Sequence, residues 1–309
     1  MTAHRRDFLL LVTLAAAAAT PALGQTALPT AGPAGSGPHG AASIPDFSGV
    51  WRHPSLPGFE PPASGPGPVT NRSRRNGVSN YNQLVGDYTN PILKPHAAEM
   101  VKKFGEISLA GVTFPSPANQ CWPEPVPYIY KNFGMQMLQQ PDKVTIIYSE
   151  DHEFRQVHMN QPHAARTTPS WYGDSVGHYE GDTLVIDTVW TRTDRPYAMI
   201  DLYGTPYTKA LHVVERYRLL DYDAAKEALE RDAKENFRPP VDIDRNYRGK
   251  YLQVQFTVED EGVFTMPWTA TITYGRGSGA WEEIVCAENR HEYYYNKDSD
   301  VPTADKPDF

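Results

Sequence analysis

Apolar and polar residues alternate along most of the chain between residues 134 and 287. Residues 143–149, for example, put Val144, Ile146 and Tyr148 on one side of an extended backbone, because alternate side chains of a strand share a face. Turn-forming pairs such as Gly181-Asp182 separate consecutive segments of this kind, as in β-hairpins. The pattern predicts short strands over 134–140, 143–149, 154–159, 175–180, 183–190, 211–220, 251–259, 268–274 and 281–287.

Helical periodicity occurs in two segments. Residues 95–104 begin with a proline suited to a first turn and carry an apolar face. Residues 223–237 start at Asp223, a candidate N-cap, and end before two prolines. About nine strands in hairpin order protect their edges best by closing on themselves. We therefore expect a mainly β fold, an antiparallel meander closed into a barrel or a strongly curved sheet, with one or two peripheral helices. A two-sheet sandwich is the alternative.

The first 24 residues have the composition of an export signal. Arg5 and Arg6 precede an apolar run that starts at Phe8, and Ala22-x-Gly24 supplies the small residues that signal peptidase requires. The paired arginines before Phe-Leu resemble a twin-arginine signal, and an ordinary secretory signal is the alternative. We expect removal of residues 1–24 and a periplasmic or secreted mature protein.

Composition divides the rest of the chain into a linker, a domain and a tail. Residues 25–44 are rich in Ala, Gly, Pro and Ser and almost uncharged, which predicts a flexible linker. Residues 45–295 hold all the predicted strands and helices, so we expect a single barrel-like domain with an irregular N-terminal extension. Residues 296–309 are polar and predict a frayed tail.

Charge and hydrophobic content narrow the classes of partner. The 309 residues include 37 acidic and 29 basic side chains, and the net charge of −8 argues against nucleic-acid binding. A hydrophobic content of 40% is sufficient for a folded core, and no segment beyond the signal is apolar enough to span a bilayer. We expect a small organic molecule as the partner, while the oligomeric state stays open.

Several motifs resemble a broad group of exported bacterial proteins. The resemblance implies export, but it implies little about a reaction or a ligand because the group is largely uncharacterised. The Gly-x-Trp opening also resembles the first strand of lipocalin-type barrels, which implies a lipocalin-like barrel, although the helix at 223–237 and the polar loop after Trp190 depart from a minimal lipocalin. The motifs that carry the first resemblance are PDFSGVW at 45–51, QPDKV at 140–144, PSWYGDSVG at 169–177, EGDTLVIDT at 180–188, LHVVER at 211–216 and CAEN at 286–289.

The chain contains two cysteines, Cys121 and Cys286. In an oxidising compartment a disulfide between them is expected, and it would stabilise the fold by roughly 2–5 kcal/mol. Two buried thiols are the alternative.

Asp187 is the first candidate for chemistry. It alternates with Val185 and Val189, so we expect its side chain to point into the barrel. A buried carboxylate needs a partner, for which Arg155, Arg216, His163 and His178 are candidates. Two interpretations remain, an acid/base or substrate-anchoring carboxylate and a structural ion pair.

The other candidates come from neighbouring strands and loops. Glu215 shares a face with Val213 and Tyr217, which places it in the interior, and a surface role is the alternative. Trp171 and Asp174 follow the long loop after residue 159, where core packing and turn formation are the structural alternatives. The candidate catalytic residues are Asp187, His163, His178, Glu215 and Arg155, and the candidate substrate-binding residues are Trp171, Tyr172, Asp174, Tyr148 and Arg216.

Metal and cofactor sites are not predicted. His152, His158 and His163 could approach one another across a hairpin, but no H-x-H, H-E-x-x-H or paired-cysteine spacing is present. A metal held by separated histidines stays open. No glycine-rich phosphate loop opens a helix, so we expect no nucleotide cofactor.

These features favour an exported barrel protein that acts on a small apolar or aromatic organic molecule in an internal pocket. The number of ionisable residues in strands favours an enzyme that uses acid/base chemistry without a cofactor, as a lyase, isomerase, hydratase or hydrolase. The alternatives are a non-catalytic, lipocalin-like binding protein and a structural domain of the envelope.

Overall fold

The structure is a computed structural model that describes residues 44–54, 58–112, 114–131, 134–149, 153–194, 198–235 and 246–277. These residues all belong to one compact unit, Ala42–Phe309. The predicted signal peptide, the linker up to residue 43, the strand at 281–287 and the tail lie outside the described residues.

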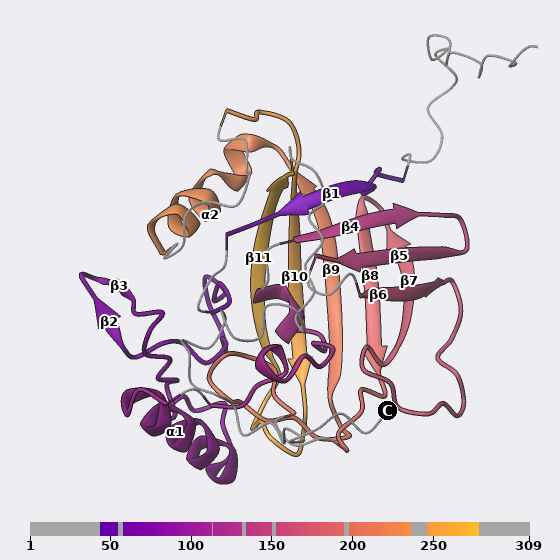
Figure 1. Ribbon diagram of the computed structural model, residues 1–309. Helices are drawn as coiled ribbons and strands as arrows, with labels where there is room; N and C mark the ends of the chain where they lie inside the picture. The colour runs from indigo at the N-terminus through magenta and orange to yellow at the C-terminus, as the bar shows by residue number, and fades with distance from the viewer. Residues whose placement is uncertain are drawn as a thin grey trace, which may run out of the picture. The chain divides into compact units, whose positions relative to one another are not determined.

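Nine strands of the described chain close into a barrel (Figure 1). The order around the wall is β1-β11-β10-β9-β8-β7-β6-β5-β4, and β4 pairs again with β1. This closure confirms the predicted barrel. The strands are β1 (Gly49–Arg52), β4 (Gly134–Gln139), β5 (Lys143–Tyr148), β6 (Phe154–Met159), β7 (Asp174–Glu180), β8 (Thr183–Val189), β9 (His212–Leu220), β10 (Tyr251–Glu259) and β11 (Trp268–Arg276), and a separate hairpin consists of β2 (Arg74–Arg75) and β3 (Val78–Ser79).

The short strand β1 closes the barrel. Trp51 pairs with Met135 of β4 on one side and with Arg276 of β11 on the other. Gly49 has a φ of 120°, and a Cβ at this position would lie 2.3 Å from the Arg276 guanidinium, which covers the Trp51 ring at 4.9 Å. The glycine of the Gly-x-Trp motif is therefore required both by the backbone conformation and by the close approach of Arg276.

One pair of neighbouring strands departs from the predicted antiparallel meander. β6 and β7 run parallel, with His158 opposite Val176. Parallel neighbours require a crossover connection, and the long loop over residues 160–173 provides it. The loop returns the chain to the end of the sheet at which β6 begins, where β7 then starts. This loop contains His163, Trp171 and Tyr172 and brings them to the end of the barrel.

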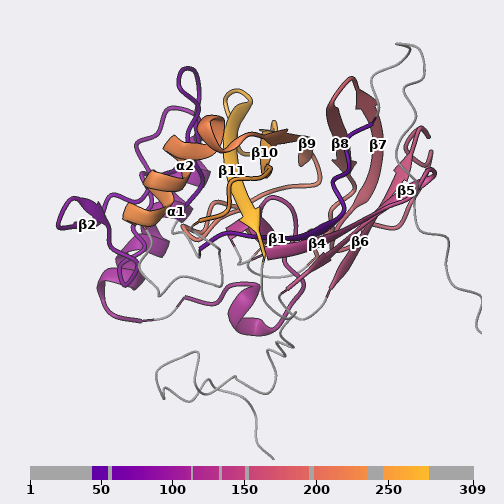
Figure 2. The ribbon, with the colours of Figure 1, turned by 90° about the horizontal axis from the view of Figure 1, so that it is seen from above.

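Two α-helices of the described residues lie outside the barrel wall. Helix α1 (Pro95–Leu109) starts at the predicted proline and continues past the predicted end, and α2 (Tyr222–Glu235) contacts β11 and β3. Asp223 lies inside the first turn of α2, which corrects its prediction as the N-cap. Figure 2 shows both helices on the side of β10 and β11, away from β5 and β6.

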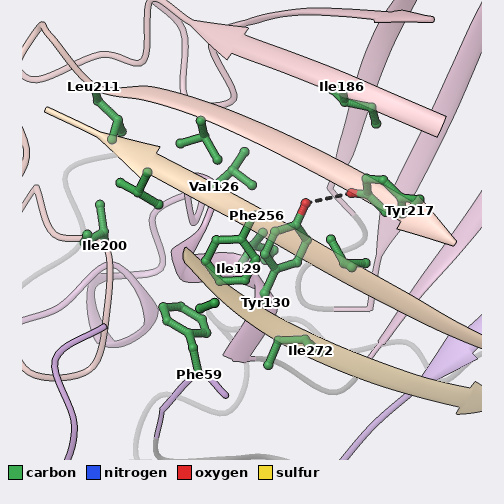
Figure 3. Close-up of a cluster of buried hydrophobic side chains, with 14 of the residues drawn as sticks. Phe59, Val126, Ile129, Tyr130, Ile186, Ile200, Leu211, Tyr217, Phe256 and Ile272 are labelled. Atoms are coloured by element: carbon green, nitrogen blue, oxygen red, sulfur yellow. Dashed lines mark hydrogen bonds between the residues drawn. The ribbon is translucent and has the colours of Figure 1, made fainter. Parts of the chain in front are cut away.

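The centre of the barrel is packed with aromatic and aliphatic side chains (Figure 3). The short 3-10 helix Tyr128–Lys131 inserts Tyr130, whose ring lies 5.4 Å from the Phe256 ring on β10. Phe59 contacts the same Phe256 ring edge-on at 5.0 Å. Such packing fixes the positions of the polar side chains that share the interior.

Candidate functional site

Arg155 of β6 spans the barrel interior to reach Glu215 of β9. Its Nη1 donates to Glu215 Oε1 at 3.0 Å and its Nη2 to Oε2 at 2.5 Å, with both side chains almost fully buried. The same guanidinium donates to Ser175 Oγ of β7 at 2.9 Å and to Thr188 Oγ1 of β8 at 2.5 Å. One side chain therefore connects four neighbouring strands, and the predicted interior position of Glu215 is confirmed.

Two tyrosine hydroxyls complete the surroundings of Glu215. Tyr217 donates to Oε1 at 2.8 Å, Tyr130 also hydrogen-bonds Oε1, and the two hydroxyls lie 2.6 Å apart. Burial raises the pKa of the Glu215 carboxyl, and the hydrogen bond from Tyr217 acts in the opposite direction. The two-pronged contact with Arg155 also favours the charged carboxylate, so the pair compensates its own burial.

A second set of buried polar residues lies beside this pair, and we call it the inner polar ring. Its members make pairwise contacts. His53 packs edge-on against Tyr274, Tyr148 stacks on Tyr172 at 5.5 Å between ring centres, and Lys131 pairs with Glu124 at 3.2 Å. The pairs also act on one another electrostatically. Besides burial, which has the largest effect in each case, Lys131 lowers the pKa of His53, Glu124 raises the pKa of Tyr172, and Tyr148 raises the pKa of Tyr274. The members are His53, Glu124, Lys131, Tyr148, Tyr172 and Tyr274.

Within the described ranges, His53 of the inner polar ring has one hydrogen-bonded and one unpartnered ring nitrogen. Its Nδ1 lies 2.5 Å from the Pro54 carbonyl oxygen, which can only accept, so Nδ1 carries the proton. Its Nε2 is buried and has no hydrogen-bond partner among the described residues. Burial lowers the pKa of His53 to about 4, despite the Pro54 hydrogen bond, and Lys131 lowers it further. At neutral pH the imidazole is therefore neutral, with an unshared electron pair on Nε2.

The tyrosines of the ring bring further polar atoms into the interior. Neither the Tyr148 nor the Tyr172 hydroxyl makes a hydrogen bond of good geometry within the described part of the chain, but the Arg155 guanidinium acts on the first and the Glu153 carboxyl on the second. Burial raises the pKa of Tyr172, and the nearby Glu153 carboxyl acts in the same direction. Both hydroxyls are therefore neutral donors. Buried polar atoms without partners are uncommon in folded proteins and often occur where a ligand or an ordered water binds.

Asp187 lies on the outer face of β8, and this corrects the predicted inward orientation. The inward positions of β8 are Leu184, Ile186 and Thr188, whereas the side chain of Asp187 is 36% exposed. Asp187 does share a face with Val185 and Val189, but this face is the outer one. Val185 is buried there because other parts of the chain cover the outside of the barrel wall. Apolar neighbours therefore marked a covered outer face, which alternation by itself cannot distinguish from the interior.

Asp187 belongs to a row of histidines and carboxylates, the outer His–carboxylate chain. Asp187 Oδ1 lies 3.1 Å from His163 Nε2 and 2.9 Å from His212 Nε2. His163 Nδ1 lies 3.0 Å from Asp174 Oδ2, and His212 Nδ1 lies 3.6 Å from Glu259. The predicted partner His163 is therefore present, and Asp174 anchors the loop instead of only forming a turn.

The contacts within the outer His–carboxylate chain favour the charged forms of Asp187 and His212. Burial would raise the pKa of Asp187, but the hydrogen bonds and charges of His212 and His163 outweigh it and lower the pKa. The hydrogen bond to Asp187 raises the pKa of His212 against the effect of burial. His212 and Glu259 also border a surface groove of about 420 Å³ whose other walls include Phe264 and Met266.

The remaining predicted site residues lie apart from both groups. His178 Nε2 lies 3.0 Å from Glu180, which accepts a hydrogen bond from Arg216 at 2.7 Å, and all three side chains are exposed. The ring centre of Trp171 lies 6.1 Å from that of Trp122. The Arg192 guanidinium lies over the Trp171 ring, 4.8 Å from its ring centre. His158 is exposed on β6.

Part of the histidine group that was considered for a metal site, and one cysteine of the predicted disulfide, are not described by the structure. His152 and Cys286 lie outside the described residues, so the Cys121–Cys286 disulfide stays a prediction. Within the described ranges no group of three or more His, Cys, Asp or Glu side chains is arranged to hold a metal ion.

Sequence reasoning missed His53, Lys131 and Glu124 of the inner polar ring. All three lie in the irregular N-terminal part, where no strand pattern indicates which side chains turn inward. The sequence Trp51-Arg52-His53-Pro54 was the available signal, because a histidine directly after a strand and before a proline is held by the backbone. His212, which contacts Asp187, was also not among the predicted site residues.

Comparisons with protein-family models, with curated proteins and with solved structures found no match. None of the helices in the described ranges has the length and apolar character needed to cross a membrane.

Proposed function

We propose that this chain is an exported enzyme that carries out acid/base chemistry on a small aromatic molecule bound at the inner polar ring. The observation that carries the proposal is His53, a fully buried, neutral imidazole whose Nε2 has no partner among the described residues. An unshared electron pair in such a position is suited to accept a proton or a hydrogen bond from a bound molecule.

The neighbours of His53 supply the other requirements of proton abstraction. The Lys131 ammonium is close enough to lower the pKa of His53, so it is also positioned to stabilise negative charge that develops on a substrate. The stacked rings of Tyr148 and Tyr172 offer a flat apolar contact, and the Tyr148 hydroxyl offers a donor. An aromatic compound with an acidic C–H or O–H bond matches this combination.

The proposed step moves one proton. His53 Nε2 takes the proton from the substrate and becomes an imidazolium, while the substrate becomes an anion beside Lys131. The anion raises the pKa of His53, because an opposite charge favours the protonated ring. Return of the proton to a different atom gives an isomerase, and loss of a leaving group gives a lyase.

Hydrogen–deuterium exchange tests this proposal. Acetophenone serves as the probe, and proton NMR in D2O follows exchange of its methyl protons. We expect the wild-type protein to accelerate exchange and His53→Gln to reduce that acceleration by about 100-fold or more. His158→Gln, a change at an exposed histidine of β6, is the matched control and should exchange like wild type. Equal exchange with His53→Gln and wild type, at equal melting temperature, contradicts the proposal.

A non-catalytic binding protein is the second candidate, and the Tyr148–Tyr172 stack favours it because aromatic stacking binds rings without chemistry. The same experiment separates the two functions. Saturable shifts of the acetophenone resonances without exchange above background support the binding protein, and exchange supports the enzyme.

Export is part of the proposal and rests on the sequence of residues 1–24. Intact-mass analysis of periplasmic protein should give a chain that begins at or near Gln25. Recovery of the full-length chain from the cytoplasm alone contradicts export.

A further inference from the structure

A cavity of about 200 Å³ lies beside β11. Helix α2 forms one wall, the hairpin of β2 and β3 another, and the segment around Glu60, which pairs with Thr271 of β11, a third. None of the residues of the inner polar ring or of the outer His–carboxylate chain lines it. The cavity is therefore a separate place in the fold.

The carboxylates that line this cavity outnumber the arginines that line it. Arg231 of α2 forms a two-pronged pair with Glu60, with 2.6 Å between Nη1 and Oε1. Arg74 of β2 pairs with Glu235 of α2 at 3.0 Å, and Glu235 also accepts a hydrogen bond from the Ser79 amide. Each arginine already has a carboxylate partner, and the carboxylate of Asp232 remains.

Asp232 lines the cavity and is buried without a hydrogen bond. Its side chain is 8% exposed, and its nearest cation is Arg231 Nη2 at 3.8 Å, beyond hydrogen-bond distance. No hydrogen bond to its carboxyl occurs in the described part of the chain. A buried carboxylate in this state is costly when charged, and a bound cation would remove that cost.

We propose that this cavity binds a small organic cation, a primary ammonium ion with a short apolar body, with Asp232 as its counter-ion. The apolar walls formed by Phe59, Pro61 and Ile272 accommodate the body of such a molecule. The volume corresponds to about six or seven waters at their share of liquid volume, which is enough for a four-carbon amine. The three-ligand geometry of a metal site is absent from the described residues, which favours an ammonium ion over a metal ion.

The affinity should depend on pH because Asp232 must be charged to act as counter-ion. Burial raises the pKa of Asp232 to about 7, while Arg231 lowers it and Glu60 raises it. The charged fraction of the carboxyl then rises about tenfold between pH 6 and pH 8 in the empty site. The other charged groups that face Asp232 are Glu235 on the same helix and Arg74 on β2, with Glu227 acting on Glu60.

Calorimetric titration with n-butylammonium chloride at about 0.15 M ionic strength tests the proposal. We expect wild-type protein to bind the ion, about tenfold more tightly at pH 8 than at pH 6, and Asp232→Asn to lose at least tenfold in affinity at pH 8. Glu230→Gln, an exposed carboxylate on the same helix, is the matched control and should bind like wild type. n-Butanol, a neutral molecule of similar shape, should bind much more weakly.

Three results overturn the proposal. They are an absence of binding to wild type, equal affinities of wild type and Asp232→Asn, and equal affinities for n-butylammonium and n-butanol. Circular dichroism melting of Asp232→Asn confirms that the variant is folded. If it is not, Phe59→Leu, which shortens an apolar wall residue that also packs against Phe256, should weaken n-butylammonium binding while leaving its pH dependence unchanged.

Discussion

Arg155 and Glu215, which are 60 residues apart, face each other across the barrel interior in a two-pronged ion pair. Ser175, Thr188, Tyr217 and Tyr130 supply the other hydrogen bonds of the two side chains. A pair of this kind tolerates removal of both charges much better than removal of one, since a single change leaves the other charge buried and unpaired.

Glu215→Gln should therefore destabilise the protein strongly. We expect a loss of about 3–5 kcal/mol in the free energy of unfolding, because the Arg155 charge stays buried without a carboxylate. Urea unfolding followed by tryptophan fluorescence measures the loss. The double variant Arg155→Met with Glu215→Leu is the control and should recover most of it. A single variant as stable as wild type contradicts the role assigned to the pair.

Asp187→Asn should lower stability most at mildly acidic pH. The folded-state pKa of His212 is raised, so its contribution is present below its unfolded value near 6.5 and is lost as pH rises through the folded value. The folded-state pKa of Asp187 is lowered, so its contribution is present above 3.8 and is lost as pH falls through the folded value.

The two contributions overlap between about pH 4 and pH 6.5. Because Asp187 is partly exposed, we expect Asp187→Asn to cost only about 1 kcal/mol at pH 5.5 and less at pH 9, measured by urea unfolding. His178→Gln, which removes an exposed contact with Glu180, is the control and should cost less than Asp187→Asn at pH 5.5. A loss that grows toward pH 9 is incompatible with the assigned contacts.

Gly173→Ala should destabilise the loop that carries Tyr172. Gly173 has a φ of 68°, and an added Cβ would lie 2.3 Å from the Val189 carbonyl oxygen. We expect a cost of about 2 kcal/mol or more from the left-handed backbone and the contact with β8. Gly181→Ala is the comparison, since Gly181 has a similar φ with nothing near its Cβ position and should cost less. Equal losses for the two variants contradict the steric explanation.

The two cysteines give a prediction that depends on export. We expect the mature, denatured and unreduced protein to contain no reactive thiol, and the two cysteines to become reactive after reduction. Reduction should lower the free energy of unfolding by roughly 2–5 kcal/mol. The double variant Cys121→Ser with Cys286→Ser should be insensitive to reductant. Two reactive thiols before reduction exclude the disulfide.

Alternation of apolar and polar residues predicted eight of the nine strands of the barrel wall, all except the closing strand β1, and most of their inward faces. Val213, Glu215 and Tyr217 point inward as the pattern of β9 indicates. The period of two is a local property of an extended backbone, so it survives in the sequence whatever the rest of the chain does. Closure into a barrel also followed from the number of consecutive hairpins.

Only the tertiary structure decided which polar residues meet. Asp187 was assigned to the interior because its neighbours are valines, yet the outer face of β8 is itself partly covered. The parallel pairing of β6 and β7 brings His163 onto β7 and β8, and no local pattern encodes that crossover. His53, Lys131 and Glu124 come from segments without periodicity, so their meeting with Tyr148 and Tyr172 depends on long-range packing. Sequence determined the wall of the barrel because strand periodicity is local, and the fold determined the site because its contacts join residues that are distant along the chain.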